Sequence, residues 1–139
     1  MAWVLWSVLS ALFAAATALL AKVGVSGIDS NLATAIRTLV IVVFAWAIVG
    51  FTYKSGELGG VTQRGWVFLL LSGLATGLSW LCYFRALQLG PASRVAPVDK
   101  LSVVFVIVFA ALLLGEKLSP GKILGGLLIT AGAITMVFA

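Results

Sequence analysis

The sequence contains no histidine and only one cysteine, Cys82. A disulfide needs two cysteines, and zinc and haem sites draw most of their ligands from these two residue types. The sequence therefore excludes a disulfide framework and predicts neither a metal site nor a cofactor. Charged residues are also scarce, at 9% of the chain, whereas soluble proteins carry about 25%. Together with 63% hydrophobic residues, this scarcity predicts an integral membrane protein embedded in a lipid bilayer.

Acidic residues are the rarest charged type, with four against nine basic residues and a net charge of +5. In a soluble protein such a surplus can indicate nucleic-acid binding, which requires basic side chains gathered into a patch. Here they are spread singly along the chain, so we expect no nucleic-acid partner. The basic residues are Lys22, Arg37, Lys54, Arg64, Arg85, Arg94, Lys100, Lys117 and Lys122.

Five long apolar stretches predict the fold. Each can cross the hydrocarbon core as a helix of about 20 residues. The stretches cover residues 2–21, 31–53, 65–89, 92–114 and 120–139. A membrane β-barrel is excluded because its strands alternate apolar and polar residues, whereas residues 103–114 are apolar throughout. We expect an all-α integral membrane protein with five transmembrane helices in one domain, residues 1–139, and a polar connection over 54–64 that lies in water.

Small residues recur at four-residue intervals in three of these stretches. In lipid, small residues let helices approach closely and associate through van der Waals contacts. The pattern therefore predicts tight helix packing, without identifying a particular dimer face. The residues are Ser10, Ala14 and Ala18, then Gly73 and Gly77, then Gly121 and Gly125.

The basic residues give the chain little preference for one orientation in the membrane. An excess of Lys and Arg near the spans normally marks the cytoplasmic side. Connections on the N-terminal side carry Lys54, Arg64, Lys117 and Lys122. Those on the opposite side carry Lys22 and Arg94, and three further basic residues lie just inside helix ends. The count of basic residues is thus four against two for the connections alone, and four against five when the three residues inside helix ends are included. It is compatible with a weakly biased single orientation or with both orientations, as in an antiparallel dimer that recreates an inverted repeat.

Four ionised side chains are expected inside the spans: Arg37, Arg85, Asp99 and Lys100. Such a group costs at least about 2.5–3.5 kcal/mol near mid-membrane, so it normally faces a cavity, the bundle interior or an opposite charge. Pro97 removes a backbone hydrogen bond next to this acid and base and is expected to kink the fourth span. This combination is the strongest functional signal in the sequence. The alternative is an ion pair that only holds the span against its neighbours.

The geometry of helices suggests partners for these groups. We expect Arg85 to pair with Asp99 across the turn at Gly90-Pro91, or else to extend toward the membrane interface. Lys100 follows Asp99 by about 100° around a helix, so the two side chains are expected to point in different directions.

Arg37 is expected to attract an anionic group such as a substrate carboxylate, or else to neutralise Asp29, eight residues earlier. The aromatic residues Trp80 and Tyr83, with Phe84 and Trp46, are candidates for lining a pocket for an organic solute. The alternative is that these rings pack between helices or face lipid.

Catalysis finds little support. The chain has no G-x-S-x-G elbow, phosphate-binding loop or metal-ligand spacing. Without histidine, an enzyme would depend on Asp99 and Lys100 alone. We therefore expect that the protein is not an enzyme and has no catalytic residue.

Three segments resemble one known family, the EamA-type domain of the drug/metabolite transporter superfamily: 96–102 (APVDKLS), 114–119 (LGEKLS) and 125–132 (GGLLITAG). The segments 83–87 (YFRAL) and 35–37 (AIR) resemble further family features. The resemblance extends over nearly the whole chain and implies transport of small organic solutes, commonly the export of metabolites or amino acids. Most relatives have ten helices in two inverted five-helix domains. This chain is similar to the short members, in which two copies assemble.

We therefore expect one half of an inverted-repeat transporter fold, acting as a secondary transporter or facilitator of a small organic solute. It would work as an antiparallel homodimer in the inner membrane of a prokaryotic cell. Pro97 is the expected hinge. The expected cavity-lining residues are Arg37, Trp80, Tyr83, Arg85, Asp99 and Lys100. The alternatives are an accessory membrane subunit that packs against a larger partner, and a passive channel. A channel needs a continuous polar stripe, whereas the last stretch offers only Thr130 and Thr135 in its deep part.

Overall fold

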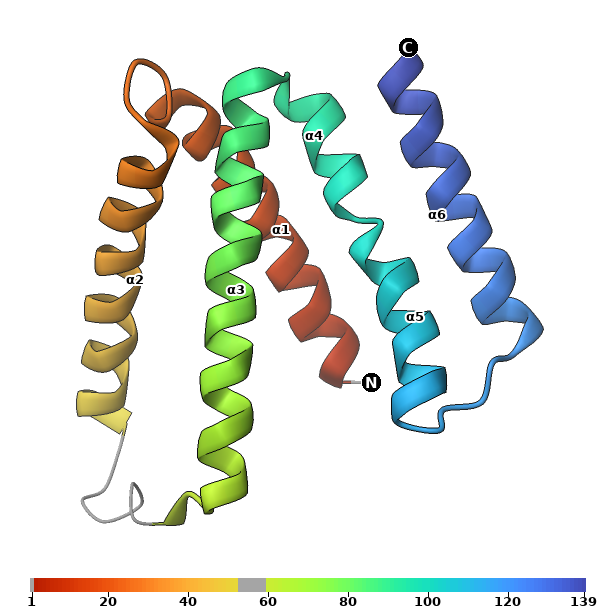
Figure 1. The fold of residues 1–139 in the computed structure, drawn as a ribbon, viewed down its shortest axis with the longest axis horizontal. Helices are drawn as coiled ribbons and strands as arrows, with labels where there is room; N and C mark the ends of the chain where they lie inside the picture. Colours follow the sequence, from red (N-terminus) through yellow and green to blue (C-terminus); the bar gives the residue numbers. More distant parts are fainter. Residues whose placement is uncertain (1, 53–59) are drawn as a thin grey trace. The chain divides into compact units, whose positions relative to one another are not determined.

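The computed structural model describes residues 2–52 and 60–139, and this part of the chain contains helices and no strand (Figure 1). The helices are α1 (Ala2–Gly24), α2 (Ser30–Thr52), α3 (Gln63–Leu89), α4 (Ala92–Asp99), α5 (Ser102–Leu113) and α6 (Pro120–Phe138). Most of the connection expected to lie in water, residues 54–64, falls outside the described residues.

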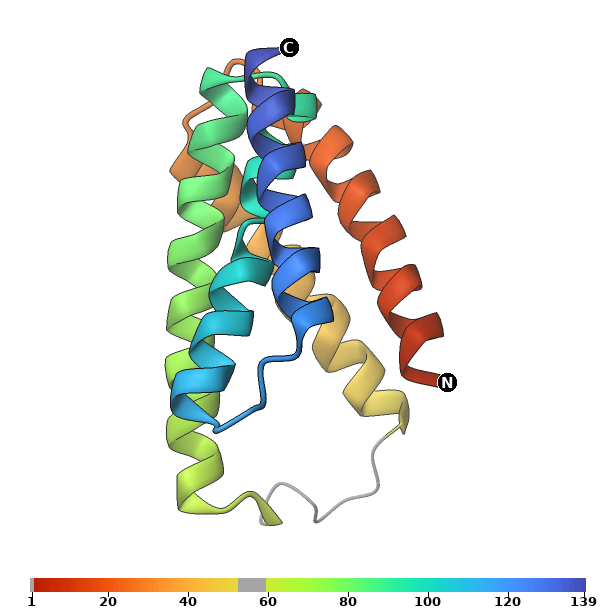
Figure 2. The same cartoon turned by 90° about the vertical axis from the view of Figure 1, so that its right-hand side faces the viewer.

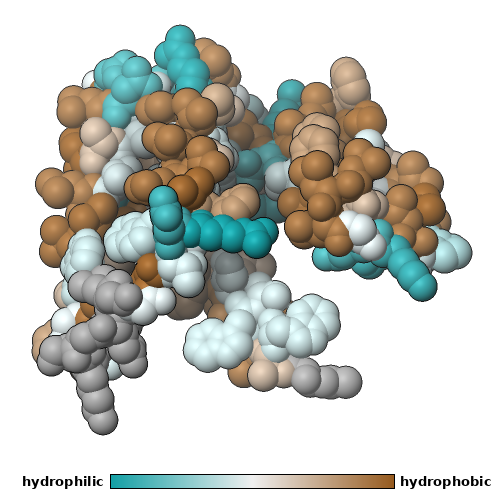
Figure 3. Space-filling view, turned by 60° about the horizontal axis from the view of Figure 1, so that its bottom comes forward, coloured by the Kyte–Doolittle hydropathy of each residue, from teal (hydrophilic) through white to brown (hydrophobic). Residues whose placement is uncertain are grey.

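Five spans are long and apolar enough to cross a membrane. Four of them are α1, α2, α3 and α6, and the fifth is the pair α4 and α5, which together run over Ala92–Leu113. Large hydrophobic side chains are exposed along all six helices, and they cover most of the helix surface visible in Figure 3. Soluble monomers rarely expose so much contiguous apolar surface, whereas lipid tails cover it without cost. The predicted all-α fold with five transmembrane helices is confirmed.

The fourth span differs from the expected continuous helix, because α4 ends at Asp99 and α5 begins at Ser102 (Figure 1). Pro97 has no N–H, so α4 has already lost one helical hydrogen bond before this point. At the break the backbone bonds shift from four residues back to three. The Lys100 N–H reaches the carbonyls of both Ala96 and Pro97 at 3.2 Å, whereas the Leu101 N–H bonds only the carbonyl three residues back, that of Val98, at 3.0 Å. The break therefore lies after the proline, beside the acid and the base.

The contacts divide the chain into two units. One contains Met1–Lys22 and Leu89–Ala139, which carry most of α1 together with α4, α5 and α6. The other, Val23–Gln88, contains α2 and nearly all of α3. The expectation of one domain over residues 1–139 stays a prediction.

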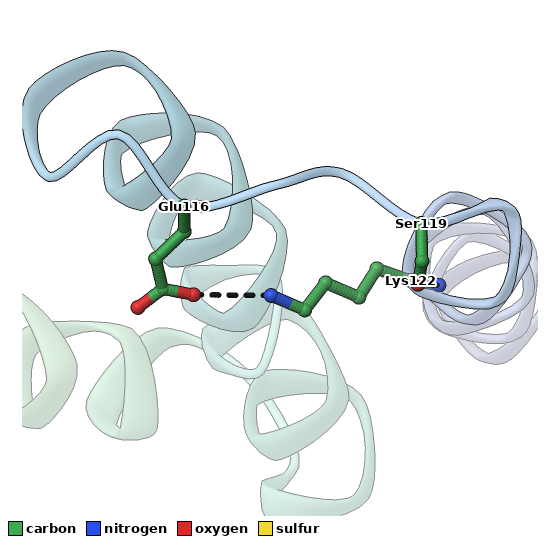
Figure 4. Close-up of polar contacts among 3 residues, drawn as sticks. All are labelled: Glu116, Ser119 and Lys122. Atoms are coloured by element: carbon green, nitrogen blue, oxygen red, sulfur yellow. Dashed lines mark hydrogen bonds and ion pairs between the residues drawn. The ribbon is translucent and has the colours of Figure 1, made fainter.

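Within the first unit, α6 packs against α4 and α5, as Figures 1 and 2 both show. The connection from α5 to α6 turns at Gly115, whose φ of +68° is a conformation that favours glycine. Ser119 then caps α6, because its Oγ accepts a hydrogen bond from the Lys122 backbone N–H at 3.3 Å. The Lys122 Nζ lies 3.0 Å from Glu116 Oε2 and closes the connection with an ion pair (Figure 4).

The close packing of α6 uses a different face from the one that the small-residue pattern indicated. A Cβ built at Gly73, Gly77 or Gly125 would meet no described atom within 4 Å. At the buried Gly126, by contrast, it would lie 3.9 Å from Cδ1 of Ile107 in α5. Within this unit α6 therefore contacts α5 through Gly126 and not through Gly125, and the expectation of tight packing at the four-residue pairs stays a prediction.

Replacing Gly126 with leucine is expected to lower the free energy of unfolding by about 1–3 kcal/mol, because the added side chain overpacks the contact with Ile107. Thermal unfolding of the purified protein in detergent measures this loss. Gly132→Leu is the matched control, since a Cβ there would have no neighbour within 4 Å. Equal stability of the two variants would contradict packing of α6 on α5 through Gly126.

Candidate functional site

Arg37 lies over two aromatic rings of α3. Its guanidinium carbon is 4.3 Å from the centre of the Trp80 ring and 5.3 Å from that of Phe84. Both distances are within the roughly 6 Å over which a cation is attracted to the face of an aromatic ring. All three residues belong to the same unit.

The sequence of α3 explains why these rings share a face. Trp80, Tyr83, Phe84 and Leu87 follow the spacing i, i+3, i+4, i+7, which places them along one side of a helix. Phe84 and Leu87 are buried, and Trp80 and Tyr83 are half-buried. The face that carries the rings is therefore the packed face of α3, and Arg37 reaches it from α2.

Arg37 has no anionic partner in the described part of the chain. The alternative partner, Asp29, has another role. Its Oδ1 accepts hydrogen bonds from the N–H groups of Asn31 and Leu32, at 2.9 and 3.1 Å, and so caps the start of α2. The idea that Arg37 neutralises Asp29 is therefore wrong.

Ring contacts alone do not balance the charge of Arg37. Each contact is worth about 0.5–1 kcal/mol where solvent reaches it, and a cation in a span costs at least about 2.5–3.5 kcal/mol. Arg37 lies seven residues into α2, about 10 Å from the helix start, and is half-buried. The arrangement thus holds a positive charge in place and leaves its hydrogen-bond donors for an anion.

Arg85 lies four residues before the end of α3, and its partner is one turn nearer that end. Its Nη1 donates a hydrogen bond to Gln88 Oε1 at 2.9 Å. Gln88 Nε2 donates in turn to the carbonyl of Ile28 at 2.6 Å, which ties the end of α3 to the connection before α2. The predicted ion pair between Arg85 and Asp99 would join the two units and stays a prediction.

Asp99 and Lys100 form an ion pair at the break in the fourth span. Lys100 Nζ lies 3.2 Å from Asp99 Oδ2, and the two side chains are 58% and 35% exposed, respectively. The expectation that they point in different directions is wrong. The long, flexible side chain of Lys100, which follows the last residue of α4, folds back onto the carboxylate of the preceding residue.

This pair is charged, accessible and inside a span. Asp99 lies seven residues after Ala92, which is about 10 Å along a span of about 33 Å. A group at this depth that is not covered by its own chain needs water, a ligand or another protein surface beside it.

The contacts not anticipated from the sequence include two long-range hydrogen bonds to backbone carbonyls. One is the bridge from Gln88 to Ile28. The other is the hydrogen bond from Lys22 Nζ to the Gly90 carbonyl at 2.9 Å, at the turn that follows α3. The Lys22 contact could have been inferred from the position of this lysine in the last turn of α1, because cations there often bind free carbonyls near a helix end.

The structure thus places the predicted residues in separate groups. Arg37 and Trp80 lie together with Phe84, and Tyr83 is on the same face of α3. Asp99 and Lys100 form the second group, three residues or fewer from Pro97. Arg85 forms a third group with Gln88. Among the described residues, no group of three or more His, Cys, Asp or Glu side chains is placed to hold a metal ion.

Comparisons with known proteins agree with the resemblance noted in the sequence. The family model described as the EamA-like transporter family matches residues 1–138. A protein of Sinorhizobium sp, named as an uncharacterized transporter in the cobO 3′ region, is 54% identical over 134 residues. The match covers 96% of this chain and 95% of that relative. No solved structure matches significantly. A family model that covers almost every residue, joined to five membrane spans, shows that this chain is an integral membrane protein of the EamA-like transporter family.

Proposed function

We propose that the protein is a secondary transporter or facilitator of a small organic solute, and that two copies in opposite orientations form the working unit. Family membership supports membrane transport. One five-helix chain supplies half of the inverted repeat on which many secondary transporters are built, and a second, inverted copy would supply the other half.

The observation that carries the dimer is the exposed Asp99–Lys100 pair inside a span. In a lone protomer this pair would face lipid. In the dimer it would line a water-containing cavity near the midplane together with Arg37, and the break after Pro97 would let the fourth span bend during alternating access. We propose in addition that the protein has no enzymatic activity and is located in the inner membrane of a prokaryotic cell.

Labelling of single cysteines in intact cells tests the two orientations. Cys82 is first replaced by alanine, and Ser26→Cys and Gly60→Cys then report the two sides of the membrane in separate variants. Gly59 would serve the same purpose but lies outside the described residues. With both orientations present, a membrane-impermeant maleimide is expected to label both variants to similar extents. Labelling of only one variant would contradict the antiparallel dimer.

The accessory-subunit alternative makes opposite predictions. A subunit that packs against a larger partner would insert in one orientation, and it would produce no solute flux when purified and reconstituted in liposomes. A metabolite screen on such liposomes therefore separates the two functions and identifies the solute.

A further inference from the structure

We propose that Arg37, held by Trp80 and Phe84, binds the anionic end of the solute, so that the substrate class is small organic carboxylates. This inference rests on the proposed transport function, but it concerns what is bound and not how it crosses the membrane. Arg37 combines a position well inside a span with a guanidinium held over two aromatic rings, and it has no anionic partner among the described residues.

The guanidinium of Arg37 is held by rings that supply no oxygen acceptor. Its carbon is 4.3 Å from the Trp80 ring centre and 5.3 Å from that of Phe84, so the rings restrict where it lies. Aromatic rings attract its charge but do not replace the oxygen acceptors that its five N–H donors require. A carboxylate presents two oxygens in the geometry that matches this planar fork.

The acidic side chains of the described residues are engaged away from Arg37. Asp29 caps α2, Asp99 pairs with Lys100, and Glu116 pairs with Lys122. These are three of the four acidic residues, and the fourth, Glu57, lies outside the described residues. The described part of the chain therefore brings no carboxylate to Arg37.

The depth of the Arg37 guanidinium favours a solute over a lipid phosphate as its ligand. Trp80 is the nearer ring and lies nine residues before the end of α3, about 13 Å inside that helix. A guanidinium that reached for a headgroup would extend toward the helix end, whereas this one lies over a ring farther in. The position suits an anion that enters the span, with Trp80 offering an aromatic surface beside it.

The test is binding to the purified full-length protein in nanodiscs of phosphatidylcholine, a lipid without net charge, measured by isothermal titration calorimetry at pH 7. The probes are benzoate, benzyl alcohol and benzylamine, which share a ring and differ in charge. We expect saturable benzoate binding and at least tenfold weaker binding of the other two probes. Arg37→Gln is expected to weaken benzoate binding at least tenfold.

Arg64→Gln is the matched control. Arg64 also lies over an aromatic ring, with its guanidinium carbon 5.7 Å from the centre of Phe68, but at the start of α3 and outside the proposed site. Its replacement is expected to leave benzoate affinity unchanged. If Arg37→Gln does not fold, as judged by circular dichroism and size exclusion, Arg37→Lys replaces it. That variant keeps the charge, loses the planar fork and is expected to weaken benzoate binding about tenfold.

Several results would overturn the proposal. One is benzoate binding no tighter than benzyl alcohol binding, and another is wild-type benzoate affinity in the Arg37 variant that folds. A third result concerns lipid binding, measured by comparing nanodiscs of phosphatidylglycerol, an anionic lipid, with nanodiscs of phosphatidylcholine. If the Arg37 variant keeps its benzoate affinity and loses only a preference for phosphatidylglycerol, the anion bound by Arg37 is a lipid phosphate. The test distinguishes failure of the proposed transport function from failure of this inference. Arg37-dependent benzoate binding without any flux would refute transport alone, whereas flux of benzylamine without benzoate binding would refute only this inference.

Discussion

Replacing Asp99 with asparagine is expected to reduce solute flux in reconstituted liposomes at least tenfold, while the protein still inserts and folds. Asparagine keeps the size of the side chain but removes the charge that lies 3.2 Å from Lys100 Nζ. The lysine is then an unpaired cation inside the span. Asp99 is also the only acidic residue within the described spans, so the variant removes the one carboxyl group there that is able to carry a proton.

The measurement compares initial rates of uptake, at equal amounts of inserted protein, for the solute that the wild-type screen identifies. Glu116→Gln is the matched control, because it also removes a carboxylate from a lysine pair, but in the connection between α5 and α6. This control is expected to retain wild-type flux. Wild-type flux from Asp99→Asn would remove Asp99 from the mechanism.

A second substitution separates a transport role from the structural alternative. If the ion pair only holds the fourth span in place, neutralising both partners should restore what breaking the pair destroys, because no unpaired charge remains. Flux from Asp99→Asn combined with Lys100→Gln is therefore decisive. We expect the double variant to stay inactive, and recovery would favour the structural ion pair.

The spans were predictable from the sequence because each depends only on its own stretch of residues. A run such as Ala2–Gly24 needs about 20 apolar residues to cross lipid, whatever its neighbours are. The interruption of the fourth span was also signalled, by a proline whose missing N–H weakens the helix. The location of the break was not predictable, because the Lys100 N–H shares its bond between the carbonyls three and four residues back and only Leu101 switches fully to a three-residue bond. Several sets of such bonds are compatible with the same sequence.

The partners of the charged residues were predicted less well because they depend on how one helix lies against another. The spacing of Trp80, Tyr83 and Phe84 is enough to place three rings on one face of α3. That Arg37 would lie over two of them follows only from the register between α2 and α3. Lys100 reversed an expectation for a local reason, since its long, flexible side chain brings Nζ back to the Asp99 carboxylate even though neighbouring side chains start about 100° apart on a helix.

Variants that fix the orientation are expected to lose transport when expressed alone and to regain it when expressed together. Gly60→Lys with Gln63→Lys raises the basic residues in the connections of the N-terminal side from four to six, against two on the other side. The opposite bias comes from Ser26→Lys, Ser93→Lys, Arg64→Gln and Lys117→Gln, which give two against four in the connections, or two against seven with the three basic residues just inside helix ends. Because a Lys and Arg excess selects the cytoplasmic side, each variant should insert one way up.

Flux must be measured in cells or in vesicles made from their membranes, where biosynthetic insertion sets the orientation. Purified protein would enter liposomes both ways, and that would hide the effect. If the working unit needs two opposed copies, each variant alone should lose at least tenfold in flux, and coexpression should restore most of it. Maleimide labelling at Ser26→Cys and Gly60→Cys, placed in the Cys82→Ala form of each variant, verifies the orientations. A singly oriented variant with wild-type flux would mean that copies of the same orientation, or one copy alone, suffice, and that the Asp99–Lys100 pair is enclosed in some other way.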